Sequence, residues 1–381
     1  MTGPTLRVAF VAGGLGKGGA EKQLVYMLDA LRTAGVALRV YTLEPGGFYE
    51  ASVRHRGVEL LSVRRRGGAA ARVVRIAAAV RSWRPHILQA AHFYANLYVG
   101  IAARLGGALG IGAIRDHPAA SHAAHGWWTG LHLRAPHFLI ANSEASRRAA
   151  EQRGVAPAAL HVVPNVIEAG PPPRLPGAGA APVAALVANL RPKKRIDRFI
   201  EALALARTTT PELRGLILGD GPEGPALRGH AARLGLGPDV LEFGGHCSDV
   251  ASRLSAADML VLSSDHEGFP NVVLEAMDAG LPVVTTPAGD SAIVVVDGVT
   301  GFVVGYDDTA AMADRMRRLA LDAGLRRRLG AAGRARVEEE YGPARLGENL
   351  LAAYRSAASK AGKQRVLEAI ASLQHPGSSG P

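Results

Sequence analysis

The sequence predicts an α/β protein made of two Rossmann-like domains that face each other across a cleft. Short apolar runs, typical of buried parallel strands, alternate with longer amphipathic segments that are typical of helices. This alternation occurs in two blocks, which are separated by a segment, 169–182, with five prolines and three glycines. Such a segment is neither helix nor central strand. We therefore expect a first domain at 1–168, a linker at 169–182 and a second domain at 183–342.

Composition sets outer limits on the function. The 381 residues suffice for two cores of ordinary size. No apolar run approaches the roughly 18–20 residues that a membrane-spanning helix needs, and Val8–Ala12 is too short for a signal peptide. The single cysteine, Cys247, excludes an intramolecular disulfide and fits a reducing compartment. The expected location is cytoplasmic.

Positive charge is concentrated in one region of the first domain. Nine arginines and one acidic residue, Glu59, lie between Arg54 and Arg84, and 69–83 has the pattern of an amphipathic helix. Such a face suits anionic lipid headgroups or a polyanionic substrate. A merely solvated basic face is the first interpretation, and peripheral binding of the Arg54–Arg84 region to an anionic membrane surface is the alternative. No motif or aromatic platform supports nucleic-acid binding.

The first domain offers two candidate binding elements. A strand at 6–12 leads into a glycine-rich loop, 13–23, where Gly18 and Gly19 let the backbone approach a phosphate or sugar closely. The loop lacks the Lys-Ser/Thr ending of an ATPase P-loop, and a tight turn with a helix cap is the alternative. His92 follows the strand at 87–90 and is expected to face the cleft, unless it is a structural histidine.

Histidine and tryptophan are clustered at 116–137. This segment holds five histidines and two of the three tryptophans, Trp127 and Trp128. Its spacing fits no zinc motif, so we expect no metal. An aromatic surface near the acceptor side and a helical hairpin with one Trp packed inside remain alternatives. After the strand at 138–141, Asn142 or Ser143 is expected to cap the next helix.

The second domain opens with a cationic loop. Residues 183–202 have the pattern of a strand, a loop and a helix, and the loop carries Arg191, Lys193, Lys194 and Arg195. Cations at the carboxyl end of a strand suit a diphosphate group, with a solvated helix start as the alternative. A strand and turn are expected at 213–221, a strand at 240–243, and helices at 310–329 and 343–361.

The most informative stretch is 258–290. It predicts a strand at 259–262, a polar turn, a helix with Pro270 at its first position that ends at Gly280, and another strand. Glu267 lies on the turn and Glu275 inside the helix. The helix start at 268–272 offers amide groups to a phosphate, and the two carboxylates suit sugar and ribose hydroxyls. The alternative is one solvated glutamate and one that favours the helix dipole.

The segment E-G-F-P-N-V-V-L-E-A-M-D-A-G-L-P-V-V resembles the E-x7-E segment of retaining nucleotide-sugar glycosyltransferases of family GT4, which have the two-domain GT-B fold. The similarity continues through A-A-D-M-L-V-L-S-S before it and D-G-V-T-G-F-V-V after it. It implies that Glu267 contacts the donor sugar and Glu275 the ribose, with helix-start residues beside the phosphate. These are Gly268, Phe269, Pro270, Asn271 and Val272.

The resemblance also assigns other residues. The loop at 244–247, with Gly245 and His246, would wrap the nucleotide base. The G-G-A-E segment at 18–21, with Gly18 and Gly19, would line the cleft near the donor diphosphate and the acceptor. His92 would lie close to the reacting centre, and we place Arg115 on the acceptor side. The last helices, 343–372, would cross back to the first domain, and we expect a disordered tail at 373–381.

One departure concerns the phosphate clamp. The family pattern is roughly G-R-L-x-x-x-K-G, and this chain matches it at Lys194. Asn189 stands where the family has arginine, and Arg195 where it has glycine. We expect Arg191, with Asn189, to replace the missing guanidinium.

The function implied is transfer of a sugar from a UDP- or GDP-sugar to a hydroxyl of a saccharide, lipid-linked or small-molecule acceptor. Such a reaction would belong to polysaccharide, glycolipid or other glycoconjugate biosynthesis, and would proceed with retention, without metal or another cofactor. Glu267, His92 and Lys194 are the expected catalytic residues. The alternatives are a nucleotide-sugar epimerase of the same fold and a non-catalytic nucleotide-sugar-binding protein.

Overall fold

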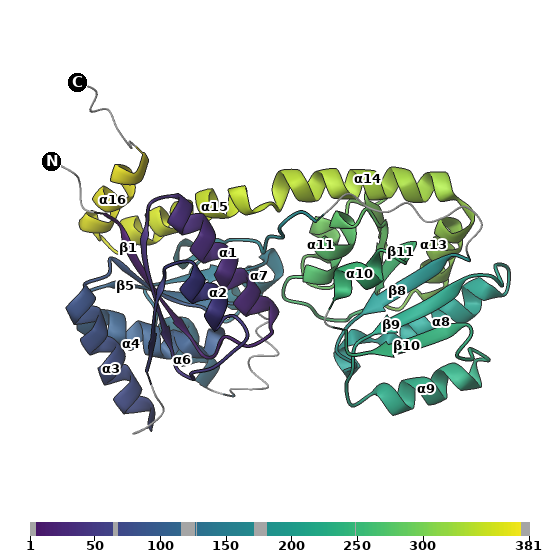
Figure 1. Cartoon of the computed structure of the whole chain (residues 1–381), viewed down its shortest axis with the longest axis horizontal. Coiled ribbons are helices and arrows are strands. Elements are labelled where there is room, and N and C mark those ends of the chain that lie inside the picture. Colours follow the sequence, from purple (N-terminus) through teal and green to yellow (C-terminus); the bar gives the residue numbers. More distant parts are fainter. Residues whose placement is uncertain are drawn as a thin grey trace. The chain divides into compact units, whose positions relative to one another are not determined.

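The chain consists of two compact units in a computed structural model, which describes residues 5–63, 68–115, 126, 128–170, 181–247 and 249–374 (Figure 1). The first unit comprises Met1–Val166 and Pro343–Pro381, and the second Ile167–Gly342. The expected linker therefore falls largely outside the described residues, as does most of the tail. In the described part of the chain, no helix combines the length and apolar character needed to traverse a bilayer.

The first unit is built on a parallel sheet with strand order β3-β2-β1-β4-β5-β6-β7. Its strands are β1 (Arg7–Ala12), β2 (Ala37–Thr42), β3 (Glu59–Ser62), β4 (Ile87–Ala90), β5 (Leu109–Ile114), β6 (Phe138–Ala141) and β7 (Leu160–Val162). Its helices are α1 (Gly19–Thr33), α2 (Glu50–His55), α3 (Gly68–Trp83), α4 (Asn96–Gly106), α6 (Trp128–Arg134), α7 (Glu144–Glu151), α15 (Pro343–Lys360) and α16 (Gln364–Ala371). Short 3-10 turns occur at η1 (Phe93–Ala95) and η2 (Pro157–Ala159).

The alternation of side chains along β1 explains why helices cover both faces of this sheet. Val8 and Phe10 point into one core, which α1, α15 and α16 complete. Ala9 and Val11 point into the opposite core, which α3 and α4 complete. Successive residues of a strand face opposite sides, so a strand that is buried on both sides reads as a continuous apolar run.

The C-terminal helices belong to the first unit, as expected from the resemblance. Leu346, Leu350 and Tyr354 of α15 are fully buried in the core beneath β1 and α1. The buried Tyr354 hydroxyl donates a hydrogen bond of 2.5 Å to Gln89 Oε1 of β4. A segment more than 250 residues from β4 in sequence thus completes the core of the first unit.

The second unit has a parallel sheet with strand order β10-β9-β8-β11-β12-β13. Its strands are β8 (Val183–Val187), β9 (Arg214–Leu218), β10 (Leu241–Gly245), β11 (Met259–Leu262), β12 (Val283–Thr285) and β13 (Gly301–Val303). Its helices are α8 (Ile196–Arg207), α9 (Gly224–Arg233), α10 (Val250–Leu254), α11 (Asn271–Asp278), α12 (Ser291–Val294), α13 (Thr309–Leu321) and α14 (Ala323–Glu340). A 3-10 turn, η3 (Pro192–Lys194), precedes α8.

Two helix boundaries differ from the prediction. The single helix expected at 310–329 is wrong: the chain breaks at Asp322, whose carboxylate accepts the Leu325 N–H and starts a new helix, α14. Pro270 is the N-cap of α11 rather than its first residue. The stop at Gly280 is confirmed, since this glycine has a φ of 72°. Ser143 is confirmed as a cap, because its side chain accepts the Ser146 N–H.

Candidate functional site

Both sheets have a topological switch point, where open α/β sheets bind their ligands beyond the carboxyl ends of the strands. In the first unit the strand order reverses between β1 and β4, and in the second between β8 and β11. The loops after these four strands carry most of the predicted site residues. Each unit therefore presents one candidate site of its own.

In the second unit, Lys194 and Glu267 lie in contact. Lys194 ends the turn after β8 and Glu267 lies on the loop after β11, and the Lys194 Nζ to Glu267 Oε1 distance is 2.5 Å. The same Glu267 oxygen accepts a hydrogen bond of 2.7 Å from Ser264 Oγ. Both side chains are largely buried, with exposed fractions of 18% and 11%. The structure thus brings the side chain predicted to bind the phosphate, Lys194, into contact with the side chain predicted to bind the sugar, Glu267.

Further bonds tie the two loops together beneath this pair. Ser263 Oγ donates to the Lys194 carbonyl at 3.1 Å, and the Asp265 N–H donates to the Lys193 carbonyl at 2.9 Å. The buried Arg198 guanidinium donates to the Ser263 carbonyl and to the carboxylate of Asp265, at 3.2 and 2.6 Å. A fixed loop–loop contact holds the catalytic candidates in place without ligand.

Arg195 stands where the family pattern has glycine, and it keeps a backbone conformation that favours glycine. Its φ of 45° and ψ of 48° are left-handed, a conformation that costs a non-glycine residue roughly 1–2 kcal/mol. The Arg195 guanidinium forms ion pairs with Asp197 at 2.9 Å and Asp265 at 3.6 Å. These pairs offset the backbone strain and add a second cation to the Asp265 loop.

The start of α11 provides fewer amide donors than the sequence suggested. Pro270 has no N–H, and the Asn271 N–H is already donated to the Phe269 carbonyl at 3.0 Å. Phe269 itself is buried. Of the five residues predicted to offer main-chain N–H groups to a phosphate, three therefore remain candidates: Gly268, Phe269 and Val272.

The remaining donor-site candidates lie elsewhere in the second unit. Glu275 is half-buried within α11, and Asn189 and His246 are exposed. Gly245 ends β10 with a φ of 66°, and its carbonyl accepts the Gly219 N–H at 2.7 Å. These loops border the carboxyl edge of the same sheet.

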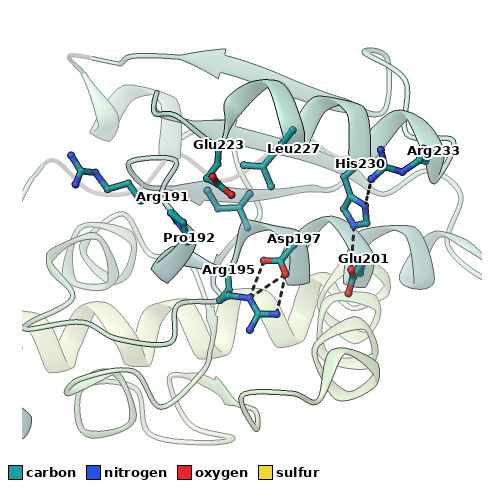
Figure 2. Close-up of a pocket in the computed structure, with 11 residues that line it drawn as sticks. Arg191, Pro192, Arg195, Asp197, Glu201, Glu223, Leu227, His230 and Arg233 are labelled. Carbon is teal, nitrogen blue, oxygen red and sulfur yellow. Dashed lines mark hydrogen bonds and ion pairs between the residues drawn. The ribbon is translucent and has the colours of Figure 1, made fainter. Parts of the chain in front are cut away.

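Arg191 lines a different pocket, of about 430 Å³, between the start of α8 and α9 (Figure 2). The pocket also contains Arg195 with Asp197, and His230, whose Nε2 lies 3.1 Å from Glu201 Oε1. Figure 2 shows the Arg191 side chain extending away from the Arg195–Asp197 pair. Neither Lys194 nor Glu267 lines this pocket. The substitution of Arg191 for the family arginine therefore stays a prediction.

In the first unit, His92 occupies the switch point between β1 and β4. Its Nδ1 accepts the Gly13 N–H at 3.4 Å, and its Nε2 lies 3.1 Å from Glu21 Oε1. Because Nδ1 is an acceptor, the neutral ring carries its proton on Nε2 and donates it to Glu21. The Tyr94 ring stacks on His92, with 5.1 Å between ring centres.

The electrostatics of this cluster keep Glu21 charged and Tyr94 neutral. Burial raises the pKa of Glu21, but the hydrogen bond from His92 and a backbone hydrogen bond outweigh it, so the pKa lies below its ordinary value. Burial, with the nearby charges of Glu21 and Glu44, raises the pKa of Tyr94 to about 12. At neutral pH the cluster therefore offers one carboxylate and one phenolic donor.

Sterics explain why a glycine stands at position 18, in the G-G-A-E segment (18–21). Gly18 is the N-cap of α1 and Gly19 its first residue, and a β-carbon on Gly18 would lie 2.1 Å from Glu21 Oε2. Gly18 thus leaves room for the carboxylate that holds His92.

Arg115, predicted on the acceptor side, turns inward. Its guanidinium donates to Asn165 Oδ1 at 3.2 Å and contacts Met27 Sδ at 3.4 Å. Burial lowers the pKa of Arg115 to about 10, which leaves it charged at neutral pH. These contacts hold the side chain beneath the end of β5, and its place on the acceptor side stays a prediction.

Most of the histidine-rich segment lies outside the described residues, including His117, His122, His125 and Trp127. Trp128 is 47% exposed and is not packed inside. His132 Nδ1 lies 3.2 Å from the Phe93 carbonyl, and His137 Nδ1 accepts the Gly110 N–H. Within the described residues, no three His, Cys, Asp or Glu side chains gather closely enough to hold a metal ion.

Sequence reasoning missed several residues that build these sites: Glu21, Tyr94, Arg198, Ser264 and Asp265. Glu21 was signalled by the G-G-A-E segment, and Ser264 and Asp265 by their place after a buried strand. Arg198 had no such signal, because a helical arginine is ordinarily solvated.

Two family models match the chain. "Glycosyltransferase Family 4" matches residues 17–170 and "Glycosyl transferases group 1" matches residues 176–336. One similar protein is N-acetyl-alpha-D-glucosaminyl L-malate synthase of Bacillus anthracis, 33% identical over 41% of this chain and 40% of its own length. Another is D-inositol 3-phosphate glycosyltransferase of Actinosynnema mirum, 37% identical over 46% of this chain and 45% of its own. The matched segments thus span less than half of these relatives.

Solved structures with the same fold cover nearly the whole chain. HepE of Anabaena, solved in complex with UDP and glucose, has a TM-score of 0.77 and 19% identity, and covers 92% of this chain and 100% of its own. The lipopolysaccharide outer core galactosyltransferase WaaB has a TM-score of 0.75 and 18% identity, covering 92% and 99%. With both halves matched by family models and two parallel Rossmann-like sheets, the chain belongs to the family 4, group 1 glycosyltransferases and has their GT-B fold.

Proposed function

We propose that the protein is a retaining glycosyltransferase that uses a UDP- or GDP-sugar and transfers the sugar to a hydroxyl group. The observation that carries this proposal is the contact between Lys194 and Glu267 at the switch point of the second sheet. A cation for a diphosphate and a carboxylate for sugar hydroxyls are held side by side on loops fixed by Arg198. Such a pair suits a ligand that combines both groups.

In the proposed reaction the bond from the anomeric carbon to the diphosphate oxygen breaks, and a bond to the acceptor oxygen forms. Lys194 and the free amides at the start of α11 stabilise the charge on the leaving diphosphate. Glu267 accepts hydrogen bonds from the donor sugar, and Glu275 from the ribose. Retention without a protein nucleophile brings the acceptor to the face that the diphosphate leaves, so the diphosphate oxygen is well placed to take the acceptor proton.

Metal independence is part of the proposal. A divalent cation usually neutralises a leaving diphosphate. Here Lys194 and Arg195 flank the start of α8, with Arg191 as a further cation on the same loop. In this scheme these charges take over that electrostatic task, and no cofactor is required.

The acceptor would be a saccharide or glycoconjugate. Two similar proteins are named N-acetyl-alpha-D-glucosaminyl L-malate synthase and D-inositol 3-phosphate glycosyltransferase, and HepE was solved with UDP and glucose. His92, oriented by Glu21, would position the acceptor beside Tyr94.

We also propose that the arginines of α3, with Arg54, Arg56 and Arg84, bind an anionic membrane surface reversibly.

The test uses the Glu267→Gln variant with Glu212→Gln, an exposed glutamate of the same unit, as its matched control. With a panel of UDP- and GDP-sugars and simple saccharide acceptors, we expect Glu267→Gln to lose about 100-fold or more in turnover and the control to match the wild type. NMR of the product should show the donor's anomeric configuration. Unchanged turnover in Glu267→Gln would contradict the role, and an epimer formed from donor alone would point to an epimerase.

A further inference from the structure

A second cavity, in the first unit, is unlike a saccharide site. It has a volume of about 500 Å³ and lies beyond the carboxyl ends of β1, β2 and β4, where α3 and α4 lie side by side (Figure 1). Gly13 and Tyr94 belong both to its wall and to the His92 cluster, since Gly13 donates to His92 and Tyr94 stacks on it. The cavity is therefore continuous with the candidate acceptor site.

Most of the cavity wall is apolar. Val73 of α3 faces Leu97, Tyr98 and Ile101 of α4 across it. Tyr94 and Ile101 are 39% and 38% exposed, so the wall is open to solvent rather than sealed within the core. An open apolar cavity of this size takes a hydrocarbon or aromatic group, since saccharides need a denser set of polar partners.

The wall also carries polar groups, namely Glu44, His132 and Arg72. Arg72 Nη1 donates a hydrogen bond of 3.2 Å to Tyr98 Oη, and its guanidinium carbon lies 5.9 Å from the Tyr98 ring centre. Arg72 Nε is buried and has no hydrogen-bond partner among the described residues. A buried donor without a partner is costly, and an anion placed beside the guanidinium would satisfy it.

The charged groups of the cavity wall have different neighbours. Arg72 lies beside Tyr98 of α4. Glu44 lies next to Gly13, whose carbonyl accepts the Glu44 N–H at 2.8 Å, and its charge helps to raise the pKa of Tyr94. The cavity is thus polarised, with a cation beside Tyr98 and a carboxylate beside the His92 cluster.

We infer that this cavity binds an amphipathic acceptor, a hydrocarbon chain joined to a phosphate, with the phosphate on Arg72. The chain packs against Val73, Leu97 and Ile101, and the acceptor's hydroxyl-bearing part reaches Tyr94 and His92. The polarity of the cavity sets this orientation, because the carboxylate of Glu44 repels a phosphate and accepts hydroxyl groups. The inference rests on the proposed transferase function and names its acceptor class as a lipid phosphate.

The test is calorimetric titration of the full chain with decyl phosphate, kept below its micelle concentration, and with 1-decanol and inorganic phosphate as separate probes. We expect decyl phosphate to bind at least tenfold more tightly than either separate probe. Arg72→Ala should weaken decyl phosphate binding by roughly tenfold to 100-fold. Arg148→Ala removes the same charge from an exposed position of α7 in the same unit, outside the cavity, and should bind as the wild type does.

Two further variants separate the apolar and polar contributions. Ile101→Asp, at a partly exposed position, should abolish decyl phosphate binding. Tyr98→Phe removes only the hydroxyl that accepts the Arg72 hydrogen bond, and decyl phosphate should still bind. Equal weakening in Arg72→Ala and Arg148→Ala, or 1-decanol binding as tight as that of decyl phosphate, would overturn the inference. So would failure of the wild type to bind decyl phosphate. UDP and GDP titrations of the same samples report the donor site of the second unit, so failure of the proposed transferase would be seen independently.

Discussion

At the scale of single residues, Lys194 and Glu267 stabilise each other until a donor binds. Each is largely buried, and removing one partner would leave an unpaired charge in a poorly solvated place. A nucleotide-sugar offers both residues a new partner, with its phosphate for the lysine and its hydroxyls for the glutamate. The pair is therefore preorganised for a ligand that carries both groups.

Gly289 fixes the position of Glu267 from the neighbouring loop. Its φ is 60°, and a β-carbon on it would lie 2.8 Å from the Glu267 carbonyl oxygen and 2.7 Å from that of Gly268. We predict that Gly289→Ala displaces this loop, destabilises the second unit by about 1–3 kcal/mol and raises KM for the donor. Donor-dependent kinetics and urea unfolding measure the two effects.

Gly298 supplies the control, because it has a φ of 72° with nothing within 4 Å of its β-carbon position. Gly298→Ala should carry the backbone penalty without the rise in KM. If both variants raise KM equally, Gly289 does not act by positioning Glu267.

At the scale of elements, two histidines accept main-chain N–H groups at the amino ends of strands. His86 Nδ1 accepts the N–H of Arg7, which begins β1, and His137 Nδ1 accepts that of Gly110 in β5, both at 3.0 Å. Burial, then the nearby charges of Arg7 and Arg365, lowers the pKa of His86. Burial, then Arg104 and Lys363, lowers that of His137. Both rings are therefore held neutral in the folded protein.

This predicts acid sensitivity of the first unit. The stabilisation is fully present above the unfolded-state pKa near 6.5 and is lost as pH falls through the lowered native values. We expect the free energy of unfolding to decrease from pH 7 to pH 5, and to decrease less steeply in the double variant His86→Asn, His137→Asn. Denaturant titrations at several pH values measure this slope, and an unchanged slope in the double variant would contradict the assignment.

Arg198 of α8 holds the loop after β11, which carries Glu267, in place. It is 4% exposed and joins α8 to Asp265 and to Asp307, at 2.6 and 2.8 Å. Arg198→Met should leave Asp265 without its buried partner, cost about 3–5 kcal/mol of stability and weaken donor binding. Arg318→Met, a cation of α13 that contacts the Phe302 ring rather than the site, is the control. Equal donor affinity in both folded variants would remove Arg198 from the site.

The strands and the second-domain site were the most predictable parts of the structure. Strands such as β11 are buried on both faces and appear as apolar runs, and polar residues after them identify the ligand edge of a parallel sheet. The break at Asp322 was missed because its capping side chain interrupts a sequence that is helical on both sides. The inward turn of Arg115 was missed because its partners, Met27 and Asn165, come from distant segments.

At the scale of the whole molecule, each unit has its own sheet and its own core, and the C-terminal helices complete the first. We predict that Leu350→Ala, at a fully buried position of α15, destabilises the first unit by about 2–5 kcal/mol. Hydrogen exchange should quicken in β1 and β4. Leu329→Ala, equally buried in the second unit, should instead quicken exchange in β8 and β9. Exchange that quickens in both sheets for either variant would contradict two independent cores.

The central claim is that the second unit binds a nucleotide diphosphate through Lys194 without a metal ion. Calorimetric titration with UDP and GDP, with and without EDTA, tests it most directly in the wild type and in Lys194→Ala. We predict that the wild type binds one of the two nucleotides, that EDTA leaves this affinity unchanged, and that Lys194→Ala weakens it by roughly tenfold to 100-fold. Binding of neither nucleotide, binding that EDTA abolishes, or equal affinity in Lys194→Ala would contradict the claim.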